Sequence, residues 1–263
     1  MSTPLEQVLT DLTIEGDRLD ALVSDLSEEG WRTPTPAAGW DVATQVAHLA
    51  WTDEAALAAA TDKDAWDALV LAALADPDGF VDESALTGGR VEPADLLARW
   101  RGARSSLADA LRAHPAGERM PWFGPPMSAT SMATARHMET WAHSLDVHEA
   151  LGAEPVIDDG IRNVVHLGVR TRGYSFSVHG LDPPTEEVRI ELTAPSGDLW
   201  SWGPEDATQS VRGSAYDFCR LVTQRVHQSD TDLVAQGREA TTWLGIAQCF
   251  AGPPGNGRSR ADG

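Results

Sequence analysis

Three residues have side chains whose types and spacing could bind a metal ion. Glu139 and His143 are four residues apart in the segment HMETWAH, which has a helical pattern. One helical turn therefore places a carboxylate and an imidazole side by side, a spacing typical of metal ligands. His48 lies between apolar residues in QVAHLAW, so we expect its ring to point toward the interior of a helical domain. Two histidines and one glutamate on different helices are a common open zinc set.

Each of these signals also has an ordinary structural explanation. A single histidine on an apolar face is more often a hydrogen-bonded core residue, and a Glu/His pair four residues apart is often a surface pair. Two further histidines fit the group less well: His137 lies about 200° around the helix axis from Glu139, and His148 follows a turn and a half after His143. Spacing alone leaves a metal site and packed histidines as alternatives.

The elements that would position these residues are long amphipathic helices in the first part of the chain. Apolar residues recur at three-to-four spacing, and Pro- and Gly-rich loops separate the helical segments. The predicted long helices cover residues 5–26, 42–61, 92–114 and 131–152, with a shorter one over 64–75. Asp41 and Gly152 have the residue types of an N-cap and a C-cap. This pattern predicts a four-helix bundle over residues 1–152.

The second part of the chain has an alternating pattern. It predicts strands over 188–195, 199–203 and 210–213, a short strand or turn over 232–237, and helices over 215–228 and 239–250. We therefore expect an α+β two-domain protein, in which a smaller α+β domain over 153–252 follows the bundle. The last residues, 253–263, are rich in Gly and Pro and are expected to be a disordered tail.

Charge and motifs exclude several classes of function. Forty acidic residues against 20 Lys and Arg give a formal net charge of -20, which would repel nucleic acid. There is no phosphate-binding loop and no GxSxG nucleophile motif. Cys219 and Cys249 lack CxxC spacing and are expected to be core residues. With no signal peptide and no apolar run that could span a membrane, we expect a cytoplasmic monomer or homodimer that binds neither nucleic acid nor membrane.

Tryptophan is unusually frequent, with ten residues against two Tyr and five Phe. Several lie near the candidate ligands in the sequence: Trp31, Trp40, Trp51, Trp122 and Trp141. We expect most of them to serve core and loop packing. A minority could line a pocket above a metal.

Two segments that contain the candidate ligands resemble a known family. TPTPAAGWDVATQVAHLAWTDEAAL is similar to the helix-two signature of the DinB-like, mycothiol-dependent maleylpyruvate isomerase superfamily, and METWAHSLDVHEALG is similar to its last bundle helix. The segments WFGPPMSATSMATARHMETWAH, HLGVRTRGYSF and LTAPSGDLWSWGPEDA resemble a metal-binding subfamily in which a second domain follows the DinB-like four-helix bundle. The resemblance covers nearly the whole chain.

The resemblance implies a divalent metal, typically zinc, bound by His48, Glu139 and His143, with a fourth position open to water or a thiolate. It also implies that an arginine of the second domain binds the substrate or the thiol. The nearest match is Arg225 in LVTQRVH, where Val-Thr-Gln-Arg replaces the family's usual tryptophan-glycine-arginine context.

We therefore expect a zinc-dependent enzyme that uses a low-molecular-weight thiol such as mycothiol for isomerisation or S-transfer on a small electrophile such as maleylpyruvate. The expected partners are this thiol and the electrophile, with Arg225 as the anion-binding residue. Two alternatives are a metal-binding module without turnover and a metal-assisted hydrolase, in which an acid such as Asp53 or Glu54 would be the base. These two carboxylates do not share the helix face of His48 and are expected to be solvated surface charges.

Overall fold

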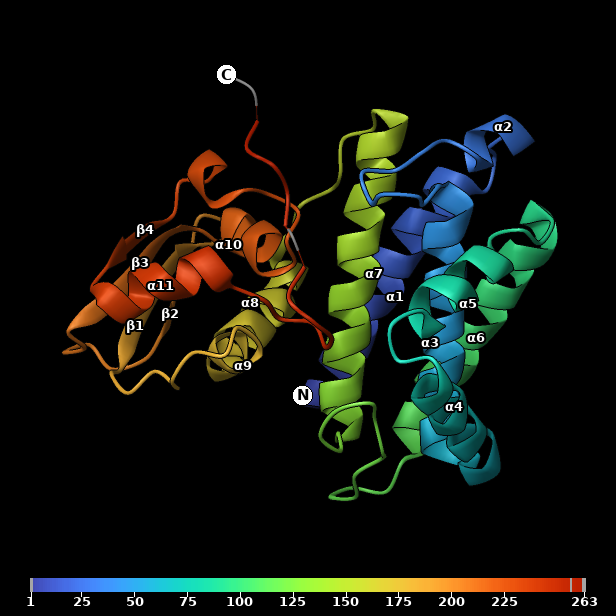
Figure 1. Cartoon of the computed structure of the whole chain (residues 1–263), viewed down its shortest axis with the longest axis horizontal. Coiled ribbons are helices and arrows are strands. Elements are labelled where there is room, and N and C mark those ends of the chain that lie inside the picture. The colour runs from blue at the N-terminus through green and yellow to red at the C-terminus, as the bar shows by residue number, and fades with distance from the viewer. Residues whose placement is uncertain (1, 256, 262–263) are drawn as a thin grey trace. The chain divides into compact units, whose positions relative to one another are not determined.

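The computed structural model describes residues 2–255 and 257–261 of the chain. The chain divides into two compact units, residues 1–155 and residues 156–263. The first unit is helical, and the second combines helices with a four-stranded sheet (Figure 1). The predicted fold class, a helical bundle followed by a smaller α+β domain, is confirmed.

Four long helices build the first unit: α1 (Pro4–Val23), α3 (Val42–Thr61), α6 (Pro93–Ala113) and α7 (Ala129–Leu151). Their ends follow from local sequence. The Asp41 carboxylate accepts a hydrogen bond from the Thr44 amide at 2.8 Å, which caps the start of α3. Gly152 takes a left-handed conformation, with φ of 62°, and ends α7. Both caps agree with the predicted helix boundaries.

Three shorter helices lie between the long ones: α2 (Glu28–Trp31), α4 (Lys63–Ala75) and α5 (Phe80–Gly88). The sequence pattern predicts α4 but misses the other two. Helix α2 begins at a Ser27 N-cap but has only four residues, too few for an apolar period, and α5 has no side-chain N-cap.

Two clusters of buried apolar side chains fill the first unit. One includes Leu19, Val46, Leu49, Trp100 and Val147, and the other includes Leu9, Ala56, Leu107, Met120 and Met132. Helix α3 packs against α5, α6 and α7, so it is surrounded on several sides. As a result, polar residues of α3 and α7 are buried together with apolar ones.

A buried ion pair joins α3 to α7. The Arg136 Nε donates to Asp53 Oδ1 at 2.8 Å, and the two side chains are only 2% and 3% exposed. Burial raises the pKa of Asp53, and the Arg136 guanidinium offsets only part of that rise. The expectation that Asp53 is a solvated surface charge is therefore wrong, because neighbouring helices enclose this part of α3. Glu54 is partly exposed and pairs with Arg99 of α6 at 2.6 Å.

The second unit contains a mixed sheet with the strand order β2-β1-β3-β4. Strand β1 (Val188–Thr193) pairs antiparallel with β2 (Leu199–Trp202) and parallel with β3 (Gln209–Ser214). Strand β4 (Val234–Gln236) adds to β3 in the antiparallel direction. All three predicted strands are present, and the segment over 232–237 contains a strand.

Four helices accompany the sheet: α8 (Arg162–Arg170), α9 (Arg172–Val178), α10 (Ala215–Val222) and α11 (Arg238–Ile246). The sequence pattern predicts the last two but extends both too far. Helix α10 ends at Val222 rather than at residue 228, because Gln224 adopts a positive φ of 60° that no right-handed helix contains.

The disorder of the tail over 253–263 stays a prediction. Residues 253–255 and 257–261 contain neither helix nor strand, and the Ala261 amide donates to Asp230 at 2.8 Å. Positions 256, 262 and 263 lie outside the described residues. Of the helices in the described part of the chain, none has both the length and the apolar character needed to cross a membrane.

The buried ion pair gives a stability prediction. Asp53→Ala leaves the Arg136 charge buried without its partner, so we expect the free energy of unfolding to fall by about 3–5 kcal/mol. Urea denaturation measures this change. The matched control is Asp82→Ala on exposed α5, for which we expect a change within about 0.5 kcal/mol.

A double variant, Asp53→Leu with Arg136→Met, removes both charges and should recover most of the lost stability. An unchanged urea midpoint for Asp53→Ala alone would contradict the role assigned to the pair.

Candidate metal centre

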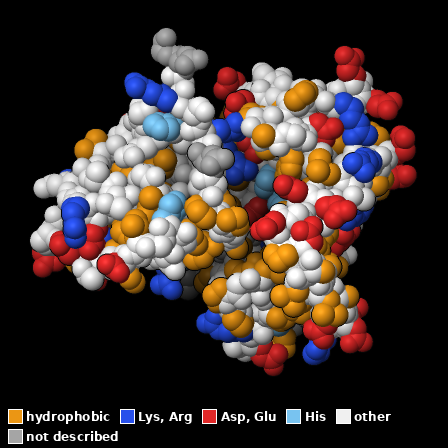
Figure 2. Space-filling model, in the orientation of Figure 1, with side chains coloured by type: hydrophobic (Ala, Val, Ile, Leu, Met, Phe, Trp, Pro, Cys, Tyr) orange, Lys and Arg blue, Asp and Glu red, His pale blue; other side chains and the backbone are white. Residues whose placement is uncertain are grey.

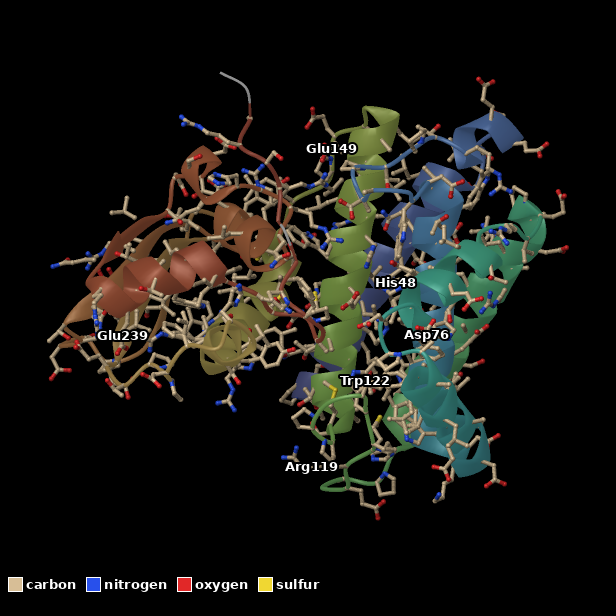
Figure 3. All side chains as sticks on the ribbon, in the orientation of Figure 1. His48, Asp76, Arg119, Trp122, Glu149 and Glu239 are labelled. Atoms are coloured by element: carbon tan, nitrogen blue, oxygen red, sulfur yellow. The ribbon has the colours of Figure 1, made fainter. Side chains whose placement is uncertain are left out.

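Helices α3 and α7 bring His48, Glu139 and His143 together within the first unit. The Nε2 of His143 lies 3.3 Å from Glu139 Oε2, and the Nε2 of His48 lies 3.6 Å from the same oxygen. The two imidazole centroids are 4.5 Å apart. One potential ligand atom from each residue lies within 4.8 Å of the others, and residues 2–255 and 257–261 contain no second group of this kind. His48 is labelled in Figure 3.

The group is largely buried but retains some exposure at its carboxylate. The side chains of His48 and His143 are 9% and 11% exposed, and that of Glu139 is 23% exposed. Burial alone would raise the pKa of Glu139, but hydrogen bonds and charges of His143 and His48 outweigh it and hold this pKa well below its usual range. Glu139 is therefore a carboxylate at neutral pH, the form that binds a cation.

Two of the three separations between donor atoms are close to those around a tetrahedral divalent ion. Bonds of about 2.0–2.1 Å from a metal to nitrogen or oxygen place two tetrahedral ligand atoms about 3.3–3.4 Å apart. The two separations from Glu139 Oε2 are 3.3 and 3.6 Å. Three such residues could hold a metal ion and would leave one tetrahedral position open, as in catalytic zinc sites.

A chain of hydrogen bonds fixes which nitrogen of His143 faces Glu139. The Thr35 hydroxyl donates to the Trp40 carbonyl at 3.0 Å and accepts from Gln45 Nε2 at 2.9 Å. The amide oxygen of Gln45 therefore points to His143 and accepts a hydrogen bond from its Nδ1. In the neutral ring, this bond keeps the proton on Nδ1 and leaves the Nε2 lone pair available to a metal ion on the side of Glu139.

The loop before α3 supplies two members of this chain. Its backbone closes on itself, since the Thr35 amide donates to the Trp40 carbonyl at 2.8 Å and the Val42 amide to the Thr33 carbonyl at 3.1 Å. Gly39 makes the turn with a positive φ of 81°. The loop therefore holds the Thr35 hydroxyl against the first turn of α3.

Sequence reasoning missed Gln45. The residue is completely buried and lies three positions before His48, one helical turn away on α3. A glutamine in an apolar stretch next to a candidate ligand is the signal that could have found it. Partners of this kind orient histidine rings in metal sites.

Two tryptophans lie against the histidines. The Trp40 ring stacks on His143, with centroids 5.8 Å apart and an interplanar angle of 16°, and it lies 5.2 Å from His48. The Trp51 ring is 6.2 Å from His48. The imidazoles thus lie in a partly aromatic environment that limits the access of water.

The structure places the other sequence candidates outside this group. His137 is buried in α7, and the Nδ1 of His148 donates to the Ser144 carbonyl at 2.8 Å. Arg225 lies in the second unit just after α10, where its Nη1 donates to the Thr223 carbonyl at 2.6 Å. Its expected role in anion binding stays a prediction.

Both cysteines are buried, as expected for core residues. Burial raises the pKa of the Cys219 thiol well above its usual value, so this thiol is a poor nucleophile.

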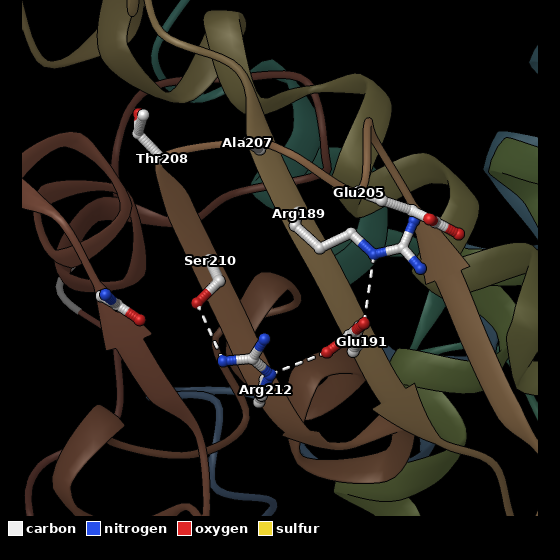
Figure 4. Close-up of a pocket in the computed structure, with 8 residues that line it drawn as sticks. Arg189, Glu191, Glu205, Ala207, Thr208, Ser210 and Arg212 are labelled. Atoms are coloured by element: carbon white, nitrogen blue, oxygen red, sulfur yellow. Dashed lines mark hydrogen bonds and ion pairs between the residues drawn. The ribbon is translucent and has the colours of Figure 1, made fainter.

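The second unit has a polar cavity of about 330 Å³ beside β1 and β3 (Figure 4). Its arginines are engaged within the protein: Glu191 pairs with Arg189 at 3.2 Å and with Arg212 at 2.7 Å, and Arg189 also donates to the Gly203 carbonyl. No histidine or cysteine is among the described residues that line it. The cavity is therefore a weaker candidate for metal chemistry than the group in the first unit.

Known proteins resemble the chain at three levels. The family described as "Mycothiol maleylpyruvate isomerase N-terminal domain" matches residues 12–148, and the one described as "Wyosine base formation" matches residues 184–236. An uncharacterized protein of Mycobacterium tuberculosis, found in two strains, is 55% identical over 250 residues, which are 95% of this chain and 97% of the relative.

Among solved structures, the mycothiol-dependent maleylpyruvate isomerase has a similar fold. The match has a TM-score of 0.61 and 18% sequence identity, and covers 91% of this chain and 99% of that one. A histidine-to-alanine mutant of the same enzyme gives a TM-score of 0.60. At this level of identity the likeness shows a common fold.

The hydrogen-bond chain predicts a measurable role for Gln45. Gln45→Ala removes the acceptor of the His143 Nδ1 proton, so we expect a shift toward the other tautomer in long-range proton–nitrogen NMR spectra. Without this orientation, zinc affinity measured by calorimetric titration should fall about 10- to 100-fold.

Gln7→Ala, at an exposed position of α1, is the control and should leave both measurements unchanged. If Gln45→Ala has the same tautomer populations and zinc affinity as the wild type, the hydrogen bond does not orient the His143 ring.

Proposed function

The chain belongs to the mycothiol maleylpyruvate isomerase N-terminal domain family, and we propose that it is a metal-dependent enzyme that uses a low-molecular-weight thiol such as mycothiol. Its reaction is isomerisation or S-transfer on a small electrophile, with maleylpyruvate as the first substrate to test. The observation that carries the proposal is the cluster of His48, Glu139 and His143. These residues come from two helices, and one potential ligand atom of each lies within 4.8 Å of the others.

These three residues would hold the metal, and zinc suits a set of two imidazoles and one carboxylate. When bound, such an ion supplies positive charge that lowers the pKa of a thiol and polarises a carbonyl group. The bond to Gln45 would keep the proton of a metal-bound His143 on Nδ1 and leave its Nε2 for the ion. The rings of Trp40 and Trp51 restrict water beside the two histidines, which strengthens electrostatic interactions at this position.

The two reactions share their first step. The thiolate sulfur forms a bond to a carbon of the activated double bond, and the alkene electron pair moves onto the conjugated carbonyl oxygen. In isomerisation, rotation about the new single bond precedes cleavage of the carbon–sulfur bond, so the thiolate is regenerated and no atom is gained. In S-transfer the carbon–sulfur bond persists, and the neighbouring carbon takes up a proton.

The positions of the acids near His48 support metal-assisted hydrolysis less well than thiol chemistry. Asp53 is buried in its pair with Arg136, and Glu54 pairs with Arg99. Neither is disposed as a base next to the metal centre. A metal-binding module without turnover would use the same three ligands, and thiol consumption distinguishes it from the enzyme.

Metal content tests the ligand set. We expect purified tag-free protein to contain about one zinc per chain by elemental analysis, and His48→Ala and Glu139→Ala to lose it. His166→Ala, at an exposed position of the second unit, should retain it. A wild-type protein that neither contains zinc nor takes it up on titration would refute the proposal.

Where zinc is present, thiol consumption with maleylpyruvate and a panel of electrophiles measures turnover. Zinc binding without consumption of mycothiol in the presence of any of these electrophiles would favour a metal-binding module without turnover.

Arg225 is proposed to bind the anionic part of the substrate or of the thiol. It is half-buried, and its guanidinium is held in part by the Thr223 carbonyl. We expect Arg225→Ala to leave zinc content intact and to raise the KM for thiol or substrate about tenfold or more, because one charge-assisted contact is lost. The control is Arg238→Ala at an exposed position, and unchanged kinetics in Arg225→Ala would remove the residue from the site.

A further inference from the structure

Most members of a group of aromatic side chains next to the metal centre have no role in the function proposed so far. We call it the aromatic wall, and it consists of Trp51, Trp66, Phe80, Trp122 and Phe123. Its members come from α3, α4, the start of α5 and the loop between α6 and α7. Segments far apart in the sequence thus contribute to one aromatic cluster within the first unit.

Phe123 is the centre of the wall. Its ring centroid lies 4.9 Å from that of Trp66, 5.3 Å from that of Trp122 and 6.4 Å from that of Trp51. Trp51 also meets the Phe80 ring edge-on at 5.2 Å. These separations are those of favourable aromatic pairs, so the wall is a preformed surface.

The wall is continuous with the metal centre through Trp51. This residue lies three positions after His48 on α3, and the two rings are 6.2 Å apart. A molecule that reacts at the metal centre could therefore extend along the aromatic rings. In Figure 2, hydrophobic side chains gather in the region where Figure 3 labels Trp122.

Part of the wall is open to solvent. Phe123 is 42% exposed, Trp51, Phe80 and Trp122 are partly buried, and Trp66 is buried. Leaving aromatic surface in water has an unfavourable free energy, and contiguous exposed apolar surface commonly marks a binding site. The position of this surface next to the metal ligands favours a small-molecule occupant.

The five rings of the wall carry no charge, and Arg119, in the same loop as Trp122 and Phe123, donates to the Pro126 carbonyl at 2.9 Å. Arg99 and Arg136 are the arginines that pair with residues of α3, and their partners are Glu54 and Asp53. Both guanidinium charges are thus compensated within the first unit. Uncharged aromatic rings attract apolar or aromatic groups more than carboxylates.

We propose that the aromatic wall binds the apolar part of the electrophile and selects aromatic or hydrophobic electrophiles over dicarboxylates such as maleylpyruvate. This inference rests on the proposed function and specifies the substrate class of the same site. Phe123 and Phe80 are its specificity-determining residues, since neither contacts a candidate metal ligand through a ring interaction.

Binding without reaction separates this inference from the thiol chemistry. Equilibrium dialysis of the purified full-length protein against m-dinitrobenzene, an unreactive aromatic compound, measures occupation of the wall, and maleate serves as the dianionic comparison. We expect saturable binding of m-dinitrobenzene to wild type, and roughly five- to tenfold weaker binding to Phe123→Ala and Phe80→Ala. Phe123→Tyr, which retains the ring, should bind as wild type does.

Leu74→Ala is the matched control, because Leu74 is 71% exposed on α4 and takes no part in the wall. It should not change the affinity. Zinc content should also be equal in all these variants, which shows that the metal centre is intact.

Three binding results would overturn the inference: no saturable binding of m-dinitrobenzene, equal affinity in wild type and both alanine variants, or stronger binding of maleate. A shift of oligomeric state in Phe123→Ala on size-exclusion chromatography would likewise overturn it, since the wall would then be a subunit interface. None of these outcomes depends on thiol turnover. Faster turnover of maleylpyruvate than of aromatic electrophiles by the wild type would leave the proposed function standing and remove only the assigned substrate class.

Discussion

The buried ion pair between Asp53 and Arg136 is the interaction on which the geometry of the metal centre depends. Asp53 follows His48 by five residues on α3, and Arg136 precedes Glu139 by three on α7. The pair therefore fixes the relative position of the two helices within about a turn of the proposed ligands. A buried ion pair adds little net stability over apolar side chains of the same size. Its main contribution is to specify one register, since a displaced helix would leave both charges buried without partners.

The hydrogen bonds around Gln45 extend this constraint from helix position to ring orientation. The ion pair sets the distance between the backbones of α3 and α7, but an imidazole can still rotate about its side-chain bonds. The bond from His143 Nδ1 to Gln45 limits that rotation, and the Thr35 hydroxyl in turn orients the Gln45 amide. Ligand spacing therefore depends on both helices and on the loop before α3.

Much of the fold and the three ligand candidates could be predicted from the sequence, but their surroundings could not. The spacing of Glu139 and His143 and the caps at Asp41 and Gly152 are local signals, and local signals suffice to place α3 and α7. Asp53 was expected in solvent because helix geometry gives its direction relative to His48 but not which helices surround it. The parallel pairing of β1 with β3 is likewise a long-range contact that the strand pattern does not encode. Tertiary packing decides each of these points.

Trp51 lies between the metal centre and the aromatic wall, so a substitution of Trp51 affects both. Its ring contacts His48 on one side and Phe80 and Phe123 on the other. Removing it would expose the imidazole to water and disrupt the wall together, so a loss of activity would not tell the two effects apart. Phe123 is the most exposed member of the wall, so a change there alters the apolar surface and leaves the Trp40 and His143 stacking in place. Variants of Phe123 therefore test substrate selection alone, whereas variants of Trp51 change both the metal centre and substrate selection.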